Sequence, residues 1–571
     1  MSNRAHVVVV TLALGATACG SLPVSHGVHR VRAVAANAPQ DTNVRLIPPP
    51  PQPGDGPVAI VTGFLRAAAS DTDRARQYLV VNAAWQPDAS VRVYSDAALA
   101  PKQVGATPAT AQHVAGSSVD VPMTPVATLD HAGALAPTAG TPVTLHFTLT
   151  DLPGVGWRIT GAVPPGVALS VSDLTSRAQV PLTFFAPTGD VVVRTPVLLD
   201  PGEDLATTAV DALLGAQPAA LRTYVPAGTA LNDVAVSSAT VIVDLTAGAA
   251  KVSREDLPRL GVQLASTLLP LEPAATGVRI DVGGRPLEGS GVYTADDVDH
   301  YDAEAASPAA DPVVVADQTP RVSTLPAAKG PVGTAAAPVA VSDDGRQVAW
   351  VRDRRVLVAP VDAPTQVTRV SGDGDWRSLS WGRDGALWLV RGDVGGATPN
   401  VAVVAAGASA PTAVAVPDSV GAPVSALRVG RDGVHAVLVA DGAMSGAVIG
   451  QDAGGPTLGD VEPVARLLTK VSTFSAPTAD GSLMAFGTFE GRRGLWRVAT
   501  DISTWLVTAT LPVAPLRSPC AGAVVPSTLA TPGGTGTAPD LAICAGVLRS
   551  HDQDGAWFDA GTAEGVAWPG G

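Results

Sequence analysis

The clearest pattern of apolar and polar positions lies in the carboxyl-terminal part of the chain. Short stretches of alternating residues there follow Asp-Gly pairs that begin at Asp344, Asp384, Asp432 and Asp480, at intervals of 40, 48 and 48 residues. Asp-Gly favours a tight turn because glycine adopts positive φ without strain. A repeat of about 40 to 50 residues with several strands is typical of a β-propeller blade. We therefore predict a mainly antiparallel propeller of about five or six blades over residues 333–571.

The middle of the chain, residues 177–290, alternates between strand and helix patterns. Apolar residues at every second position predict a strand, and apolar residues at every third or fourth position predict a helix. The second helix follows a serine with an acid three residues later, a capping pattern. The predicted elements are strands at 180–185, 234–236, 240–245 and 278–282, a helix at 205–214 and a helix opened by residues 253–256. This order predicts an α+β domain.

A first α+β domain is predicted over residues 57–176. Apolar residues recur at helical spacing from Val58 to Leu79, with a break at Ser70 and Asp71. Strand-like alternation follows at 90–94, 143–149 and 156–159. We assign residues 291–332 as a linker. The expected fold class is thus multidomain, with two α+β domains followed by the propeller.

The amino terminus predicts export and lipid attachment. One basic residue, Arg4, precedes the apolar run Val7–Leu14, which has eight residues where about 20 are needed to cross a bilayer. Small residues then lead to Cys19, as in a bacterial lipobox. We expect a signal peptide at 1–18, lipidation of Cys19 and a Pro-rich tether over 19–56, which would hold the protein at the outer face of the cell membrane. The alternative is an ordinary secretory signal with an incidental cysteine.

Charge and cysteine content narrow the function classes. The formal net charge is −14 and the pI is about 5.0, so the chain offers no basic face for nucleic acid. Beyond Cys19 there are two cysteines, Cys520 and Cys544. In an oxidising compartment they would form a disulfide; the alternative is a pair of buried free thiols.

A search for catalytic and metal-binding patterns finds no complete motif. The chain has no phosphate-binding glycine loop, no Gly-x-Ser-x-Gly elbow and no His-Glu-x-x-His sequence. His300 and His435 are expected at the surface or in turns. The acids at 373–375 and 552–555 resemble the start of calcium loops, but hairpin turns explain them equally well. We therefore predict no catalytic residue, no metal ligand and no cofactor.

The order of these parts resembles the LpqB family of actinobacterial lipoproteins. Residues 75–79 and 85–87 fit the amino-terminal LpqB pattern, and four segments resemble a GerM-type domain, first known from spore germination proteins: 213–215, 225–231, 241–245 and 263–268. The resemblance implies a non-catalytic accessory partner of the MtrB sensor kinase in the MtrA–MtrB two-component system. Such a partner affects cell division and envelope homeostasis.

Two other functions stay open on the sequence. One is an extracellular sensor or hydrolase of envelope glycans, with its site in the propeller channel. The other is a scaffold that positions other envelope proteins. A pocket with convergent carboxylates would favour the glycan enzyme, whereas a channel without them would favour a binding module.

Overall fold

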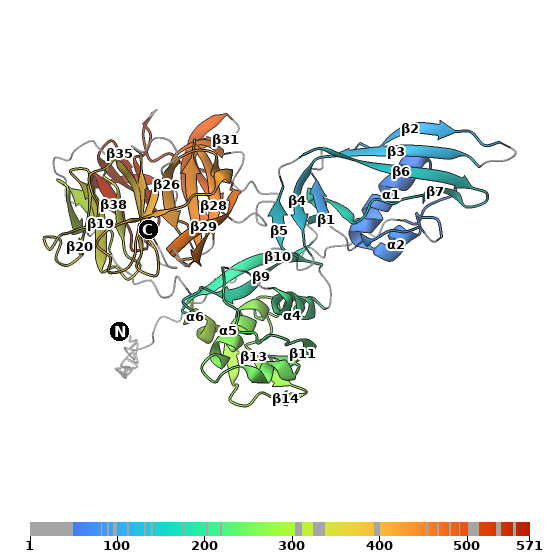
Figure 1. Cartoon of the computed structure of the whole chain (residues 1–571), viewed down its shortest axis with the longest axis horizontal. Helices are drawn as coiled ribbons and strands as arrows, with labels where there is room; N and C mark the ends of the chain where they lie inside the picture. The colour runs from blue at the N-terminus through green and yellow to red at the C-terminus, as the bar shows by residue number, and fades with distance from the viewer. Residues whose placement is uncertain are drawn as a thin grey trace, which may run out of the picture. The chain divides into compact units, whose positions relative to one another are not determined.

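The computed structural model describes residues 49–570 apart from short gaps, the longest of which are 303–310, 324–336, 393–399 and 501–512. Two α+β domains and a β-propeller follow one another along the described chain (Figure 1). The predicted fold class is confirmed.

The first domain begins with a helix whose interruption is encoded locally. Helix α1 (Pro57–Ser70) has proline at its first turn and ends where Asp71 adopts an extended conformation. The Asp71 side chain then accepts a hydrogen bond from the backbone N–H of Arg74, at 3.0 Å, and caps α2 (Thr72–Arg76). At the break predicted at Ser70 and Asp71, α1 therefore ends and Asp71 serves as the N-cap of α2.

Two four-stranded sheets complete this domain. Phe64 of α1 packs edge-to-face on Trp85 and Phe147, with ring centroids 5.1 and 5.9 Å apart, so α1 covers the first sheet. The first sheet has the order β2 (Lys102–Thr107), β3 (Gly116–Met123), β6 (Val143–Leu152), β7 (Gly156–Thr160). The second has the order β5 (Leu135–Pro137), β4 (Pro125–Leu129), β1 (Val91–Tyr94), β8 (Val167–Ser170), and is followed by the short helix α3 (Val171–Leu174).

The end of the predicted tether contacts this domain. The hydroxyl of Tyr78 donates a hydrogen bond to the carbonyl of Pro49 at 2.5 Å, and a Cβ on Gly156 would lie 3.0 Å from the carbonyl oxygen of Pro53. Residues 49–56 therefore lie against the domain, and the part of the tether that could act as a spacer ends before them.

The second domain has its core between a sheet and two helices. Its central strands β12 and β13 are parallel, and α5 packs on them through Leu260, Leu264 and Leu268, all fully buried. The elements are β9 (Ala178–Phe185), β10 (Val192–Leu199), α4 (Leu205–Gly215), β11 (Leu231–Ser237), β12 (Thr240–Leu245), the 3-10 helix η3 (Ala247–Lys251), α5 (Leu257–Leu268), β13 (Gly277–Val282), β14 (Arg285–Pro286), β15 (Val292–Thr294) and α6 (Ala295–Asp299).

The capping pattern at residues 253–256 forms a separate turn, which lies just before the helix. The Ser253 hydroxyl accepts from the backbone N–H of Asp256 at 3.0 Å and donates to the Asp256 carboxylate at 2.8 Å. A turn occupies these residues, and α5 begins at Leu257 with Pro258 in its first turn. Proline there needs no hydrogen-bond partner for a backbone N–H, which fixes the start of the helix.

The linker assigned to residues 291–332 is corrected by the structure. Tyr293 of β15 and Val298 of α6 belong to the core of the second domain. Strands β16 (Val313–Ala316) and β17 (Thr319–Val322) pair with each other, and β16 pairs with the last strand of the chain, β38 (Gly565–Ala567). The propeller therefore begins at Val313. The sequence pattern missed this because the partner of β16 lies some 250 residues away in the chain.

Five four-stranded sheets and one closing sheet make up the propeller in the described part of the chain (Figure 1). The first blade is β18 (Val339–Val341), β19 (Gln347–Arg352), β20 (Arg355–Pro360), β21 (Thr368–Arg369); the second is β22 (Trp376–Trp381), β23 (Leu387–Arg391), β24 (Val401–Val404), β25 (Thr412–Val414). The third is β26 (Val424–Val429), β27 (His435–Ala440), β28 (Ala443–Asp452), β29 (Gly455–Pro463), with a single 3-10 turn, η4 (Asp418–Val420), before it. The fourth is β30 (Leu468–Phe474), β31 (Ser482–Phe489), β32 (Arg492–Ala499), β33 (Val513–Leu516); the fifth is β34 (Thr528–Ala530), β35 (Leu541–Cys544), β36 (Val547–His551), β37 (Trp557–Thr562).

The first strands of the blades form the inner ring of the propeller. Strand β22 contacts β18 and β26, β34 contacts β30 and β38, and β38 contacts β18. The closing sheet has the order β38, β16, β17, so the carboxyl end of the chain supplies the inner strand and the earlier segment supplies the outer ones. Six blades result, the upper end of the expected number.

Candidate functional site

The repeated Asp-Gly pairs mark one kind of turn, between the first and second strands of a blade. Gly345, Gly385, Gly433 and Gly481 all have φ between +70° and +78°, the left-handed region that glycine tolerates. In the first three turns the preceding aspartate accepts a hydrogen bond from the backbone N–H two residues later. We call these the inner turns. The first of them brings Asp343, the residue just before its aspartate, close to the equivalent residue Arg383 of the second blade.

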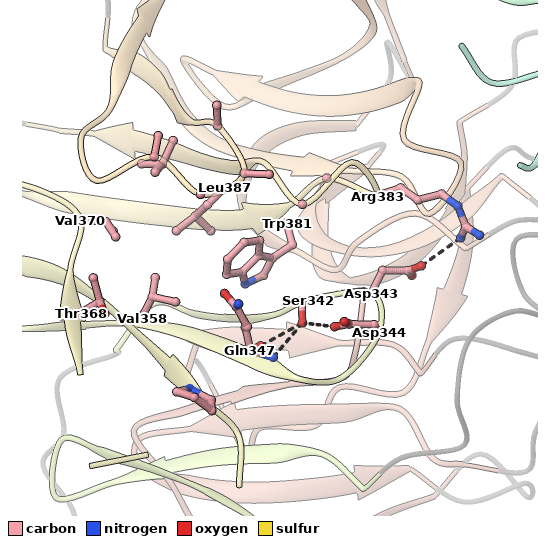
Figure 2. Close-up of a pocket in the computed structure, with 18 of the residues that line it drawn as sticks. Ser342, Asp343, Asp344, Gln347, Val358, Thr368, Val370, Trp381, Arg383 and Leu387 are labelled. Atoms are coloured by element: carbon pink, nitrogen blue, oxygen red, sulfur yellow. Dashed lines mark hydrogen bonds and ion pairs between the residues drawn. The ribbon is translucent and has the colours of Figure 1, made fainter. Parts of the chain in front are cut away.

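A cavity of about 670 Å³ opens between the first and second blades, beside their inner turns. The carboxamide of Gln347 points toward the indole of Trp381, and Val358, Val370 and Leu387 form an apolar wall (Figure 2). We call this space the inter-blade cavity. Its remaining polar lining is Ser342, Asp343, Asp344, Gln366, Thr368, Arg383 and, from the second domain, Asp190.

Charged side chains at the mouth of this cavity form a connected series. Arg383 Nη1 donates to Asp343 Oδ2 at 2.9 Å (Figure 2), and Arg383 Nε donates to Asp190 Oδ2 at 3.1 Å. Asp343 Oδ1 is buried, lies 4.0 Å from Arg431 Nη1 and has no hydrogen-bond partner among the described atoms. Arg431 Nη2 in turn donates to the carbonyl of Pro569. Ion pairs thereby link three successive inner turns, and a hydrogen bond joins the third of them to Pro569.

Burial and ion pairing act in opposite directions on these carboxyl groups. Burial raises the pKa of Asp343, and the nearby Arg383 and Arg431 offset only part of that rise. Burial also raises the pKa of Asp344. Hydrogen bonds from the Ser342 hydroxyl and the Arg346 backbone N–H lower it by more, so the pKa of Asp344 lies below its ordinary value. Both acids thus already have donors from the protein itself.

The inter-blade cavity is therefore better suited to hold a neutral polar molecule than to perform acid–base chemistry. Within the described chain, the side chains of Gln347, Gln366 and Thr368 have no hydrogen-bond partner. Their amide and hydroxyl groups can donate and accept toward a ligand, while the apolar wall contacts its less polar face. A glycoside hydrolase would instead need two carboxyl groups free to act on the substrate.

The two carboxyl-terminal cysteines are joined in the structure. Cys520 and Cys544 form a disulfide with their Cα atoms 5.5 Å apart, which ties the segment before β34 to the end of β35 in the fifth blade. Cys19 lies outside the described residues, so the structure does not bear on its predicted lipidation.

The acidic clusters and histidines singled out in the sequence occupy surface and turn positions. Asp373 pairs with Arg355, at 2.5 Å, and Asp375 pairs with Arg377, at 2.8 Å, as expected for turn residues. His300 ends helix α6, and His435 bonds to Asp432 beside an inner turn. Residues 552–555 lie outside the described part. The described residues contain no group of three or more histidine, cysteine or acidic side chains placed to hold a metal ion.

The residues that line the inter-blade cavity were not singled out from the sequence. Gln347, Trp381 and Arg383 sit in or next to the repeated motifs, yet only closure of the ring brings neighbouring motifs together. One signal was available: the residue before each Asp-Gly pair is charged in three successive repeats, as Asp343, Arg383 and Arg431. Aligning the repeats would have shown opposite charges at equivalent positions.

Family models match three parts of the chain. Residues 50–175 match the model for the N-terminal domain of lipoprotein LpqB, and residues 313–522 match that for the lipoprotein LpqB beta-propeller domain. Residues 162–288 match a model described as sporulation and spore germination. The two LpqB models together span more than half of the chain, in the order in which the domains occur.

The chain belongs to the LpqB lipoprotein family. Lipoprotein LpqB of Thermobifida fusca is 29% identical over 551 residues, an alignment that covers 84% of this chain and 87% of the relative. Lipoprotein LpqB of Streptomyces coelicolor is 29% identical over 520 residues and covers 80% of each chain. The likeness thus extends through all three domains.

Membership of the LpqB family places this chain among lipoproteins. Its curated relatives are named as lipoproteins and not as enzymes. In the part of the chain that the structure describes, none of the helices is both long enough and apolar enough to cross a bilayer.

Proposed function

We propose that this LpqB-family protein is a non-catalytic accessory regulator of a two-component sensor kinase of the MtrB type. In this proposal it acts outside the cell membrane and influences cell division and envelope homeostasis. The observation that carries the proposal is the complete LpqB domain order, with a propeller and a GerM-type domain on one chain.

Lipid attachment through Cys19 is the second part of the proposal. A kinase with an external domain is confined to the membrane, so a partner held there by acyl chains meets it at a raised effective concentration. Two acyl chains give stable attachment, since each buried methylene contributes about 0.8 kcal/mol. The lipobox-like sequence before Cys19 supports this anchor.

Direct binding to the kinase is the decisive test. Residues 20–571 would be titrated into the purified external domain of the cognate MtrB-type kinase and followed by calorimetry. We expect saturable binding that is lost when the GerM-type domain or the propeller is removed. No binding up to high micromolar concentration, together with no crosslink between the lipidated protein and the kinase in membranes, would refute the partnership.

Binding of an envelope glycan is a second candidate function, favoured by the inter-blade cavity. The sequence analysis places such a site in the propeller channel, whereas the cavity lies between two blades. Gln347 and Thr368 offer the hydrogen-bonding groups that sugar hydroxyls require. Soluble glycan fragments would be titrated into wild type and Gln347→Ala. Binding that is equal in both proteins would remove the cavity as the site.

A further inference from the structure

Arg428 lies where the inner strands of three successive blades meet. It belongs to β26 of the third blade, and its Nη1 donates to the Ser378 hydroxyl at 2.5 Å and to the Leu379 carbonyl at 3.0 Å, both on β22 of the second blade. Its guanidinium carbon is 6.0 Å from the ring centroid of Phe474 on β30 of the fourth blade. The side chain therefore reaches across the inner side of the ring.

The propeller architecture does not require a long side chain at this position. Arg428 is four residues before the aspartate of its inner turn, and the residues four before the other three aspartates are Ala340, Ser380 and Ala476. Small side chains thus suffice in the other repeats. The arginine is a particular feature of the third blade.

The positive charge of Arg428 has no counter-charge from the residues that the structure describes. Among the described residues no carboxylate lies within ion-pair distance of its guanidinium, and burial lowers the pKa of Arg428 to about 10. Holding an arginine away from bulk water without an acid opposes folding. The residue therefore carries a cost that alanine or serine would avoid.

One edge of the guanidinium remains available to a ligand. All hydrogen bonds of Arg428 to described residues come from Nη1. Nε and Nη2 make none, yet neither is among the buried atoms that lack a partner, and the side chain is only partly buried. Each of these two nitrogens therefore keeps some accessible surface, while most of the side chain is shielded from bulk water. The Nε–Nη2 edge is the planar fork that binds both oxygens of a carboxylate.

We infer that Arg428 forms a binding site for a carboxylate monoanion at the inner end of the second to fourth blades. One guanidinium neutralises one negative charge, which favours a carboxylate over a doubly charged phosphate. The ring of Phe474 suits an apolar group next to that carboxylate. A small organic acid and the carboxyl terminus of a peptide share this chemistry.

Ligand-dependent stabilisation of the full chain in neutral detergent micelles tests the site. A ligand that binds only the folded protein raises its melting temperature as its concentration increases. We expect saturable stabilisation by propionate, and none by propionamide or by chloride at equal ionic strength. Stronger stabilisation by acetyl-dialanine than by propionate would indicate a peptide terminus, and the reverse order would indicate a small acid.

Two variants separate this site from a purely structural role of Arg428. Arg428→Met should weaken propionate binding by about tenfold or more, because it removes a charge-assisted pair of hydrogen bonds. Arg377→Met on the neighbouring strand β22 is the matched control, since Arg377 pairs with Asp375 at the surface, and should bind as wild type does. Equal binding by Arg428→Met, or stabilisation of wild type by inorganic phosphate alone, would overturn the inference. If Arg428→Met does not fold, equal effects of propionate and propionamide on wild type would still refute it.

Discussion

At the scale of single residues, the aspartates of the inner turns carry much of the local order. Asp432 Oδ1 accepts from the backbone N–H of Val434 at 2.9 Å and of His435 at 3.0 Å, while Oδ2 contacts the His435 ring. Burial opposes ionisation of Asp432, but His435 and these hydrogen bonds together lower its pKa. The turn therefore favours the charged form of the acid.

We expect Asp432→Asn to reduce the free energy of unfolding by about 1 kcal/mol at neutral pH, because the amide keeps an acceptor and loses the charge. A lowered pKa in the folded state means that the unfolded chain binds more protons in the interval between the two pKa values. The stabilisation is thus present above the ordinary aspartate pKa and is lost as pH falls through the folded-state pKa. Denaturant unfolding at several pH values checks this; a difference between wild type and variant that stays constant down to strongly acidic pH would contradict it.

At the scale of elements, closure of the propeller depends on one short strand. Val566 of β38 is 98% buried, pairs with Val314 of β16 and packs in the core of the last blades. The residues that it joins are distant in sequence, so closure costs chain entropy that their packing has to offset. A small loss of packing at β38 therefore acts on the whole ring.

Val566→Ala should lower the free energy of unfolding by about 2 kcal/mol through the cavity that it leaves. Val322→Ala on β17 of the same sheet is the matched control, because Val322 is half exposed. Its stability should match that of wild type. Denaturant unfolding followed by tryptophan fluorescence measures both, and equal losses in the two variants would show that closure does not depend on β38 packing.

The disulfide stabilises the fifth blade, which has no Asp-Gly pair between its first and second strands. Cys520 and Cys544 are 24 residues apart, and closing such a loop in the unfolded chain is worth about 3 kcal/mol. The double variant Cys520→Ser, Cys544→Ser should lose about that amount. A reducing agent should destabilise wild type and leave the double variant unchanged. If the reducing agent has no effect on wild type, the two cysteines are free thiols in solution.

At the scale of the whole molecule, the proposed function gives the predicted anchor and the folded domains separate roles. Residues 49–56 lie against the first domain through Tyr78, so the spacer to Cys19 is shorter than the Pro-rich composition suggests. In the proposed function, this spacer keeps the domains near the membrane, where they reach an external kinase domain. Attachment then rests on Cys19 alone.

Cys19→Ser should release the protein from the membrane, because serine offers no sulfur for lipidation. We expect loss of incorporation of labelled palmitate and a shift of the protein from the membrane to the soluble fraction. Cys544→Ser is the control, since that cysteine lies in the propeller, and it should stay membrane-bound. Membrane attachment of Cys19→Ser without labelled lipid would indicate a retained signal segment instead.

Local pattern was enough to predict the fold class and many individual elements. The Asp-Gly spacing identified the propeller because each inner turn needs a glycine at positive φ, as at Gly385 and Gly433. Apolar spacing identified α1 and α5, and the small residues before Cys19 predicted export. Each of these features depends on residues close together in the chain.

Only the tertiary structure decided features that depend on distant partners. The pairing of β16 with β38 moved the start of the propeller to Val313, and closure of the ring created the inter-blade cavity. The position of Arg428 between β22 and Phe474, without a carboxylate among its described neighbours, also became visible only in the tertiary structure. Sequence periodicity shows which face of a segment is buried in the core. Which segments become neighbours is decided by the packing of the complete ring.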